Sequence, residues 1–431
     1  EVSYQNSSKD KTTLSIVDLA ELSGNVPEAF RDFAVSTGAL IDSDQYQVVS
    51  NARSDARGFG VPTVDNQVDL IHLAQGIGTP EARAFIAALE GCIKYNRTSN
   101  NISNANGLSI YFPYGKLSTL QPMLNTYDEI GMDAQYSDTL KSFANLEVGG
   151  QAVSSGTGNP LESLLGQFTG GQTGSTGADL ISGLLGSFLG EGDFSSILGD
   201  VAGGASDWIN PDKIRASTEY YENNYLDSAD LVFTKKGNDR VLSLTDEQWD
   251  IVQNISLNVF LDDGEGFIDL GMDNTYTFDE DFDLVADYDG TWLALNGQVV
   301  SYYFMSEDGD TITGRVPAML NGQLVDIILV FDEQDPYGKV LGASIVYGEE
   351  SLSIAKGLIE IVDGDEIDFL CDYYSYDEEY TDSFFLGERM IVNGDFYISN
   401  VDVGSGDCKV TYMLTDIYNN TYWTPAFDYE E

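Results

Sequence analysis

In the first third of the chain, hydrophobic residues recur in some segments at helical spacing and in one segment at every second position, as in a strand. Apolar residues recur at helical spacing in "FRDFAV" (30–35), "VDLIHLAQGI" (68–77) and "PEARAFIAALEGCIKY" (80–95). In "GLSIYFPYG" (107–115), apolar and polar positions alternate until proline and glycine end the run, which is typical of a short strand entering a loop. This mixture of helices and strands predicts an α/β fold for residues 1–145.

The pattern changes in residues 146–206, which we predict to be a linker. The tracts "GGQAVSSGTGNP" and "TGGQTGSTG" are rich in glycine, serine and threonine, and the section contains no lysine or arginine. Three apolar stretches interrupt it: "LESLLGQF", "ADLISGLLGSFLG" and "FSSILGDVA". We expect short helices here, which either pack on a neighbouring domain or contact a partner or a membrane surface.

Residues 207–431 are predicted to form an all-β, sandwich-like domain. Asn-Gly pairs at 296–297, 321–322 and 393–394 lie between strand-forming runs, and each pair accepts the positive φ angles of a type I′ hairpin turn. Further strands are expected in "ISLNVFL", "GASIVYG" and "CKVTYMLTDIY", and a short helix or turn in "LTDEQWDIVQNI". Many short strands with regular turns favour a sandwich or a barrel.

The composition is that of a globular protein with an extreme acidic charge. The 431 residues are 42% hydrophobic and 12% aromatic, and the net charge is −51. Residues 206–431 hold 48 acidic and 10 basic residues. This charge disfavours nucleic acid and anionic membranes as partners and favours cations or basic polypeptides. We interpret it mainly as an extracellular surface kept soluble by its charge, and no apolar run reaches the roughly 18 residues of a membrane-spanning helix.

Candidate nucleophiles and bases are few. The single histidine, His72, lies on a predicted amphipathic helix, where a partly buried structural role is the more common one. Cys92 has the helical spacing of a small core residue, and Cys371 and Cys408 lie among carboxylates, which disfavour a thiolate. The three cysteines do not form a disulfide framework or a zinc motif. We therefore predict no catalytic residue and no cofactor-binding residue in this chain.

Two carboxylate clusters are candidate calcium ligands. The first contains Asp279, Asp281, Asp283, Asp287 and Asp289, and the second contains Asp262, Asp263, Glu265 and Asp269. Oxygen-rich clusters suit calcium, but Leu284 and Gly290 occupy the positions where a helix-loop-helix calcium loop has glycine and glutamate. Calcium is thus a candidate cofactor, with an acidic surface as the more common explanation. A pair of carboxylates would also serve a glycosidase, but the sequence fixes no separation between two of them.

The first section resembles the clostripain family of cysteine peptidases. The resemblance rests on "KTTLSIVDLAEL" (11–22), "ARSDARGFGVPTVDNQVDLIHLAQGI" (52–77) and "NANGLSIYFPYG" (104–115), in the order of the later part of that family's caspase-like α/β core. "FLDDGEGFIDLGMDN" and "YDGTWLALNGQVV" look like the β extension of larger bacterial members. The resemblance implies a secreted or bacterial cell-surface endopeptidase that cleaves after arginine or lysine.

The family's catalytic motifs are a histidine next to glycine and a cysteine in a sequence close to Asp-Ala-Cys-Leu-Met, and neither motif occurs here. The resemblance then implies that the catalytic pair lies before Glu1, on an upstream chain that remains a partner of this one. We expect this chain to be inactive alone, and residues 1–145 to depend on upstream strands to complete their sheet.

A second interpretation is a non-catalytic secreted binding protein. It would combine a caspase-like remnant with an acidic β module that binds a surface polymer, a basic partner or calcium. The upstream catalytic motifs separate the two interpretations, since the peptidase requires them and the binding protein does not.

Overall fold

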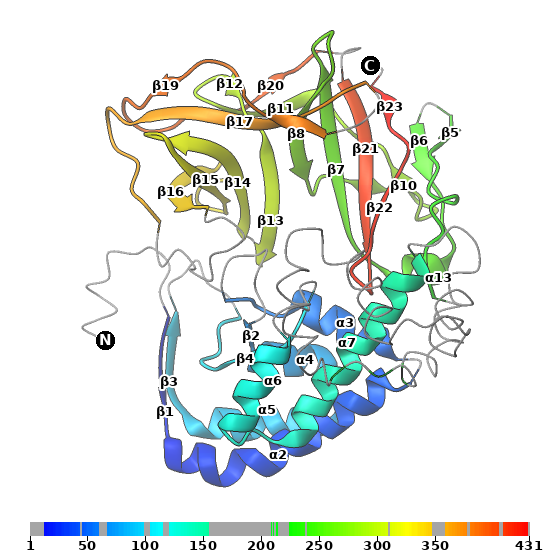
Figure 1. Ribbon diagram of the computed structural model, residues 1–431, viewed down its shortest axis with the longest axis vertical. Coiled ribbons are helices and arrows are strands. Elements are labelled where there is room, and N and C mark those ends of the chain that lie inside the picture. Colours follow the sequence, from blue (N-terminus) through cyan, green and yellow to red (C-terminus); the bar gives the residue numbers. More distant parts are fainter. Residues whose placement is uncertain are drawn as a thin grey trace, which may run out of the picture. The chain divides into compact units, whose positions relative to one another are not determined.

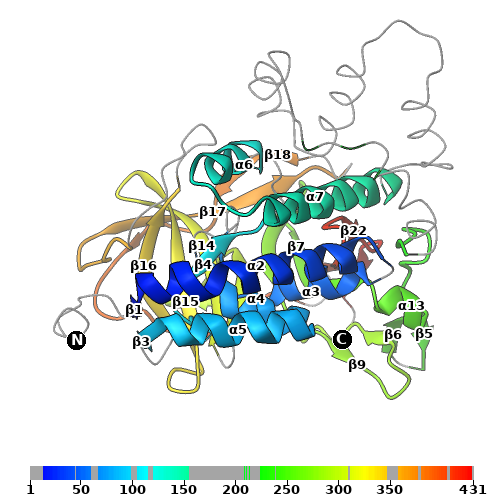
Figure 2. The same cartoon turned by 90° about the horizontal axis from the view of Figure 1, so that it is seen from below.

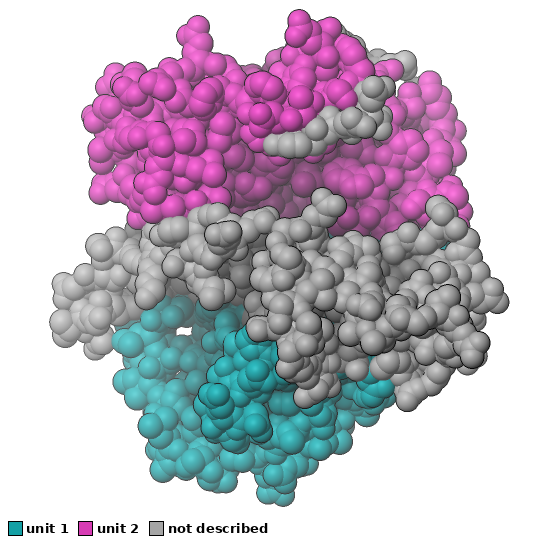
Figure 3. Space-filling view, in the orientation of Figure 1, with its two compact units in different colours: residues 1–226, 247–253, 415–420 teal, residues 227–246, 254–414, 421–431 magenta. Residues whose placement is uncertain are grey.

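The computed structural model divides the chain into two compact units, each described here by itself (Figure 3). Unit 1 comprises residues 1–226, 247–253 and 415–420, and unit 2 comprises 227–246, 254–414 and 421–431. The structure describes residues 13–43, 45–59, 67–98, 104–114, 120–154, 208, 210, 213, 224–237, 239–308, 311–346, 358–376, 380–404 and 408–429. The three apolar stretches predicted as linker helices lie outside these residues.

Helices dominate the described part of unit 1 (Figure 1). They are α2 (Leu19–Ile41), α3 (Tyr46–Asp55), α4 (Leu70–Ile77), α5 (Pro80–Cys92), α6 (Leu120–Glu129) and α7 (Ala134–Ser154). Helix α2 packs against both α5 and α7, which flank it in Figure 2. Among the described residues, no helix is long and apolar enough to cross a membrane.

Local sequence explains where these helices begin. The Asp18 carboxylate accepts hydrogen bonds from the backbone N–H groups of Ala20 and Glu21 at the start of α2. The Asp69 side chain caps α4 in the same way, and Thr79 caps α5, whose first residue is Pro80. The helical patterns read from the sequence are therefore confirmed, although α4 starts after Asp69 and α5 ends at Cys92.

The strands of unit 1 form two separate antiparallel pairs among the described residues. Strand β1 (Thr13–Val17) pairs with β3 (Ile93–Thr98), and β2 (Gln67–Asp69) pairs with β4 (Ser109–Tyr111). Strand β4 confirms the strand expected in "GLSIYFPYG". Aromatic rings fill the core under the helices: Phe33 stacks on Phe85 with ring centroids 4.9 Å apart.

Unit 2 is built from sheets, as its alternating sequence predicts. A twelve-stranded sheet has the path β16–β15–β14–β13–β8–β7–β21–β22; β17 pairs with β14 and β8 of that path, β23 pairs with β21, and β18 and β19 pair with β17. The path strands are β7 (Val252–Asp262), β8 (Phe267–Asp273), β13 (Tyr302–Asp308), β14 (Thr311–Leu320), β15 (Gln323–Phe331), β16 (Lys339–Ile345), β21 (Cys408–Asp416) and β22 (Thr421–Trp423). The others are β17 (Glu366–Tyr374), β18 (Tyr380–Phe385), β19 (Met390–Ile391) and β23 (Phe427–Asp428).

Two smaller sheets and one short helix complete the described elements. One sheet has the order β12–β11–β20, formed by β11 (Thr291–Leu295), β12 (Gln298–Val299) and β20 (Ile398–Asp402). The other has the order β5–β6–β10–β9, formed by β5 (Thr234–Lys236), β6 (Asp239–Leu242), β9 (Thr277–Phe278) and β10 (Leu284–Val285). Helix α13 (Asp246–Trp249) lies in the segment predicted as a helix or turn.

Two of the three Asn-Gly predictions are confirmed and one is wrong. Asn296–Gly297 and Asn321–Gly322 have positive φ at both residues and join β11 to β12 and β14 to β15 as two-residue hairpins. At 393–394 only Gly394 has positive φ, and the flanking strands do not pair: β19 pairs with β17, and β20 with β11. Tertiary pairing with other strands therefore overrides the local turn signal there.

Candidate functional site

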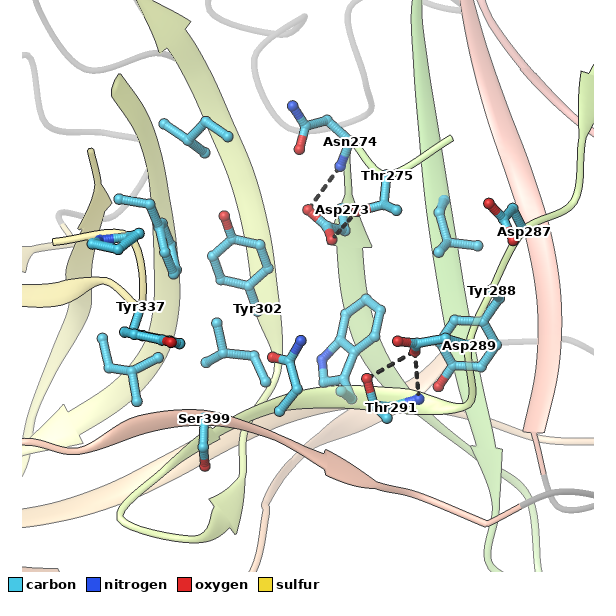
Figure 4. Close-up of a pocket in the computed structure, with 18 residues that line it drawn as sticks. Asp273, Asn274, Thr275, Asp287, Tyr288, Asp289, Thr291, Tyr302, Tyr337 and Ser399 are labelled. Atoms are coloured by element: carbon cyan, nitrogen blue, oxygen red, sulfur yellow. Dashed lines mark hydrogen bonds between the residues drawn. The ribbon is translucent and has the colours of Figure 1, made fainter. Parts of the chain in front are cut away.

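Unit 2 contains a pocket of about 740 Å³ lined by residues from seven strands and the loops between them (Figure 4). This volume falls in the range of pockets that hold small ligands or a few peptide residues. The lining residues are Leu257, Asp273, Asn274, Thr275, Asp287, Tyr288, Asp289, Thr291, Trp292, Leu293, Tyr302, Ile312, Phe331, Pro336, Tyr337, Ile398, Ser399 and Asn400.

Threonine hydroxyls donate hydrogen bonds to all three pocket carboxylates, and the longest of these bonds joins Thr277 to Asp287 at 3.4 Å. Asp273, the last residue of β8, accepts hydrogen bonds from the Thr275 hydroxyl at 2.7 Å and from the backbone N–H of Asn274 at 2.9 Å. Asp289, in the loop before β11, accepts from both the hydroxyl and the backbone N–H of Thr291 through one oxygen (Figure 4). No hydrogen bond is formed to the other oxygen of Asp289 by a described residue, which leaves it able to accept from a ligand.

Aromatic rings form a large part of the pocket wall. The Tyr302 ring lies edge to face with Phe331, with centroids 6.1 Å apart. It fits against β14 because residue 314 is glycine: a Cβ there would lie 2.1 Å from the Tyr302 ring. Trp292 is 96% buried, and its indole Nε1–H has no hydrogen-bond partner among the described residues. Such a buried donor costs stability, and its burial keeps it out of contact with a ligand in the pocket.

The pocket carries negative charge without a positive counterpart. Asp273, Asp287 and Asp289 form no ion pair with a described residue, and no lysine, arginine or histidine lines the pocket. The described basic residues of unit 2 that form ion pairs do so elsewhere, and they are Lys236, Arg315, Lys339, Arg389 and Lys409. The pocket is therefore suited to a ligand that brings its own positive charge.

The hydroxyls of Tyr302 and Tyr288 remain protonated at neutral pH. Burial, followed by the nearby Asp273 carboxylate, raises the pKa of Tyr302 far above its ordinary value. Burial is also the main cause of the raised pKa of Tyr288, with Cys408 and Asp289 contributing. Both hydroxyls thus act as neutral hydrogen-bonding groups and not as bases.

The first predicted calcium cluster is divided by the fold. Asp287 and Asp289 line the pocket, whereas Asp279, Asp281 and Asp283 surround the Lys236 ammonium with N–O distances of 2.7, 2.7 and 2.9 Å. One oxygen from each of the three lies within 4.8 Å of the others, a spacing that would also hold a metal ion. The hydrogen bond from Lys236 is the main cause of the lowered pKa of Asp279 and of Asp283.

The second predicted cluster is not brought to one point by its hydrogen bonds. Asp269 is buried and accepts from the Asn258 amide, the Gly271 N–H and the Tyr303 hydroxyl. Asp262 and Asp263 accept instead from the hydroxyls of Tyr376 and Tyr373, and Glu265 donates its backbone N–H to Asp263. These contacts indicate a structural role in fixing the β7–β8 hairpin and β17.

His72 and Cys92 have structural contacts in unit 1. The His72 Nδ1 accepts a hydrogen bond from the Arg57 backbone N–H at 2.9 Å, and burial lowers the pKa of the imidazole. Cys92 ends α5, and its thiol donates to the Leu89 carbonyl oxygen at 3.1 Å. Burial raises the pKa of that thiol, which disfavours the thiolate.

The other two cysteines, Cys371 and Cys408, are also buried, and neither forms a disulfide bond with a described residue. Burial is the main cause that raises the pKa of Cys371 to about 11, and the neighbouring Asp372 adds to it. Cys371 lies in β17 and Cys408 starts β21, so both side chains belong to the packing of the large sheet.

Sequence reasoning missed a buried polar cluster in unit 1. Glu147 of α7 is fully buried, and neither carboxylate oxygen has a hydrogen-bond partner among the described residues. Burial raises its pKa well above the ordinary value; the buried Arg53 of α3 opposes this effect, and the buried Asp416 adds to it. The only sequence signal was a glutamate at a core position of a helical pattern.

Comparisons with family models, curated proteins and solved structures found no match to this chain. The functional argument therefore depends on the residues and the geometry of the chain itself.

Proposed function

We propose that this chain is a binding protein and that the pocket of unit 2 binds a positively charged ligand. The observation that carries the proposal is the set of three pocket carboxylates, Asp273, Asp287 and Asp289, which have no described cationic partner and share their pocket with aromatic rings. Carboxylates supply the opposite charge, and aromatic faces attract cations through their quadrupole. The proposal thus assigns a site and a ligand charge to the acidic β module of the second sequence interpretation.

The test is binding of a short lysine-containing peptide, measured by isothermal titration calorimetry. Changing the three pocket carboxylates to asparagine should weaken binding by about tenfold or more, because a hydrogen bond to a charged group contributes about 1.5–3 kcal/mol. A matched variant, Glu280→Gln/Glu388→Gln/Asp395→Asn, removes three exposed carboxylates outside the pocket and changes the net charge equally. Equal losses in the two variants would show general attraction to an acidic surface and would refute the site.

A second candidate function is a part in a clostripain-like cysteine endopeptidase that cleaves after arginine or lysine. Besides the sequence resemblance, it is supported by the strands of unit 1, which form only two-stranded pairs among the described residues and so leave strand edges open to further strands. In this proposal the catalytic histidine and cysteine come from an upstream chain, and the protein is secreted or associated with the bacterial cell surface.

The peptidase proposal is tested with the complete gene product. Hydrolysis of an arginyl or lysyl peptide substrate should be lost when the upstream cysteine is changed to alanine. Activity that survives this change would contradict the proposed nucleophile, and a reading frame without the upstream histidine and cysteine motifs would contradict the peptidase itself.

A further inference from the structure

The pocket of unit 2 has two chemically different sides. Figure 4 shows Asp273, Asp287 and Asp289 on one side, Tyr337 on the other, and Tyr302 between them. The acidic residues come from the end of β8 and from the loop between β10 and β11. The opposite wall comes from β14, β15 and the loop after β15, and its residues are Ile312, Phe331, Pro336 and Tyr337.

The loop that carries Tyr337 is held in place by hydrogen bonds and by an ion pair. Asp332 accepts hydrogen bonds from the backbone N–H groups of Gln334 and Asp335, and the Gly338 N–H donates to the Asp335 carbonyl oxygen. The Lys339 ammonium pairs with the Asp335 carboxylate at 2.7 Å and with Asp332 at 3.6 Å. The two residues of this loop that line the pocket, Pro336 and Tyr337, are both uncharged.

Tyr337 offers apolar surface to a ligand. Tyr337 is 83% exposed and lines the pocket. The next residue, Gly338, has a φ of +85° and lies so close to the Phe331 ring that a Cβ there would be 2.5 Å from it. A large aromatic ring exposed to this extent gains from contact with an apolar group. A bare metal ion or a polyamine would satisfy the carboxylates and leave this side of the pocket unused.

A peptide supplies both chemical groups that the two sides of the pocket suit. It carries a basic side chain next to an apolar one, whereas a simple amine or a metal ion brings only the positive charge. The volume of about 740 Å³ also exceeds what one lysine or arginine side chain fills.

We propose that the pocket binds a peptide segment in which a lysine or arginine lies next to an apolar residue. The basic group faces Asp273, Asp287 and Asp289, and the apolar side chain contacts Tyr337. This inference rests on the proposed function, because it assumes that the pocket binds positive charge, and it adds the chemical class of the partner.

The experiment compares four probes by calorimetry on the full chain: Ac-Lys-Leu-Gly-NH₂, Ac-Lys-Gly-Gly-NH₂, Ac-Gln-Leu-Gly-NH₂ and butylamine. We expect the Lys-Leu peptide to bind about tenfold more tightly than the Lys-Gly peptide, and both to bind more tightly than the Gln-Leu peptide and butylamine. Tyr337→Ala should remove the difference between the Lys-Leu and Lys-Gly peptides. The matched control Phe385→Ala, which removes a 64% exposed ring outside the pocket, should preserve it.

The two proposals fail in different ways. If the Lys-Leu and Lys-Gly peptides bind equally, or if Tyr337→Ala leaves their difference intact, the paired recognition of charge and apolar surface is wrong, while the cation site stands. If butylamine binds as tightly as the peptides, the peptide class is wrong. If no basic probe binds, the proposed function itself is wrong.

Discussion

Single residues in this protein show how burial changes the chemistry of a carboxyl group. Glu147 of α7 is fully buried, with Arg53 of α3 as its cationic neighbour and Asp416 as its anionic one. Asp416 has three N–H donors, from Tyr418 and from the backbone and side chain of Asn420, whereas the oxygens of Glu147 have none among the described residues. Glu147 is therefore expected to be protonated in the folded protein.

We predict that Glu147→Gln reduces the loss of stability at high pH. The pKa of Glu147 is raised by folding, so unfolding releases a proton at any pH above the unfolded pKa of about 4.3 and below the raised folded pKa. Across that window its contribution destabilises the fold by up to about 1.4 kcal/mol for each pH unit. Glutamine stays neutral, so urea unfolding at pH 5 and pH 8 should show a smaller difference for the variant.

The control is Glu129→Gln at the exposed end of α6, which should leave the pH dependence unchanged. The same slope for the parent chain and for Glu147→Gln would mean that Glu147 is ionised in the folded state, contrary to the structure.

At the scale of elements, local sequence signals predict a turn correctly where a few adjacent residues determine its backbone conformation. The turns at Asn296–Gly297 and Asn321–Gly322 were predictable because their φ requirements are met by two adjacent residues. The hairpin predicted at the third Asn-Gly pair does not form, because the flanking strands β19 and β20 pair with strands distant in sequence. The pocket was not predictable for the same reason: its lining runs from Leu257 to Asn400, and only the strand pairing brings these residues together.

Two glycine substitutions should change stability in opposite directions. Gly322→Ala places a Cβ at a φ of +81° and should cost about 1 kcal/mol. Gly24→Ala, at an exposed position inside α2 with no atom within 4 Å of the new Cβ, should stabilise by about 0.5–1 kcal/mol. Thermal unfolding followed by circular dichroism tests both, and a shift in the same direction for the two variants would contradict the backbone argument.

The β5–β6–β10–β9 sheet should depend on Lys236. Lys236→Met removes the cation that lowers the pKa values of Asp279 and Asp283, so these carboxylates should repel one another at neutral pH. A lowered folded pKa contributes stability above the unfolded pKa of about 3.9, and this contribution disappears as the pH falls. Hydrogen exchange of β6 and β10 should therefore accelerate in the variant at pH 7, with little change at pH 3.

Lys235→Met, one residue earlier on the same strand, removes the same charge without touching the three aspartates and is the matched control. Calcium at about 1 mM provides a second readout. Restored protection in Lys236→Met would support a calcium site at these carboxylates, and unchanged protection would count against it.

At the scale of the whole molecule, repulsion between the many negative charges destabilises the folded state. A net charge of −51 produces repulsion that acts over the Debye length, which shrinks from about 30 Å at 0.01 M salt to about 8 Å at 0.15 M. Sodium chloride in this range should raise the melting temperature of the protein. Potassium chloride should give an equal rise, and a melting temperature that falls with either salt would show that attractive ion pairs outweigh the repulsion.

The turn at 415–420 has a consequence for how the protein is made. This turn belongs to unit 1, yet it is translated after almost all of unit 2, and Tyr418 stacks on Tyr46 with ring centroids 5.7 Å apart. Of the two units, unit 1 is synthesised first, and its core is complete only after residues 415–420 have followed unit 2. Expression of residues 1–226 alone would yield a unit without this ring or the Ile417 carbonyl that Ser50 binds. Dissection into independent fragments would require the turn to be supplied as a separate peptide.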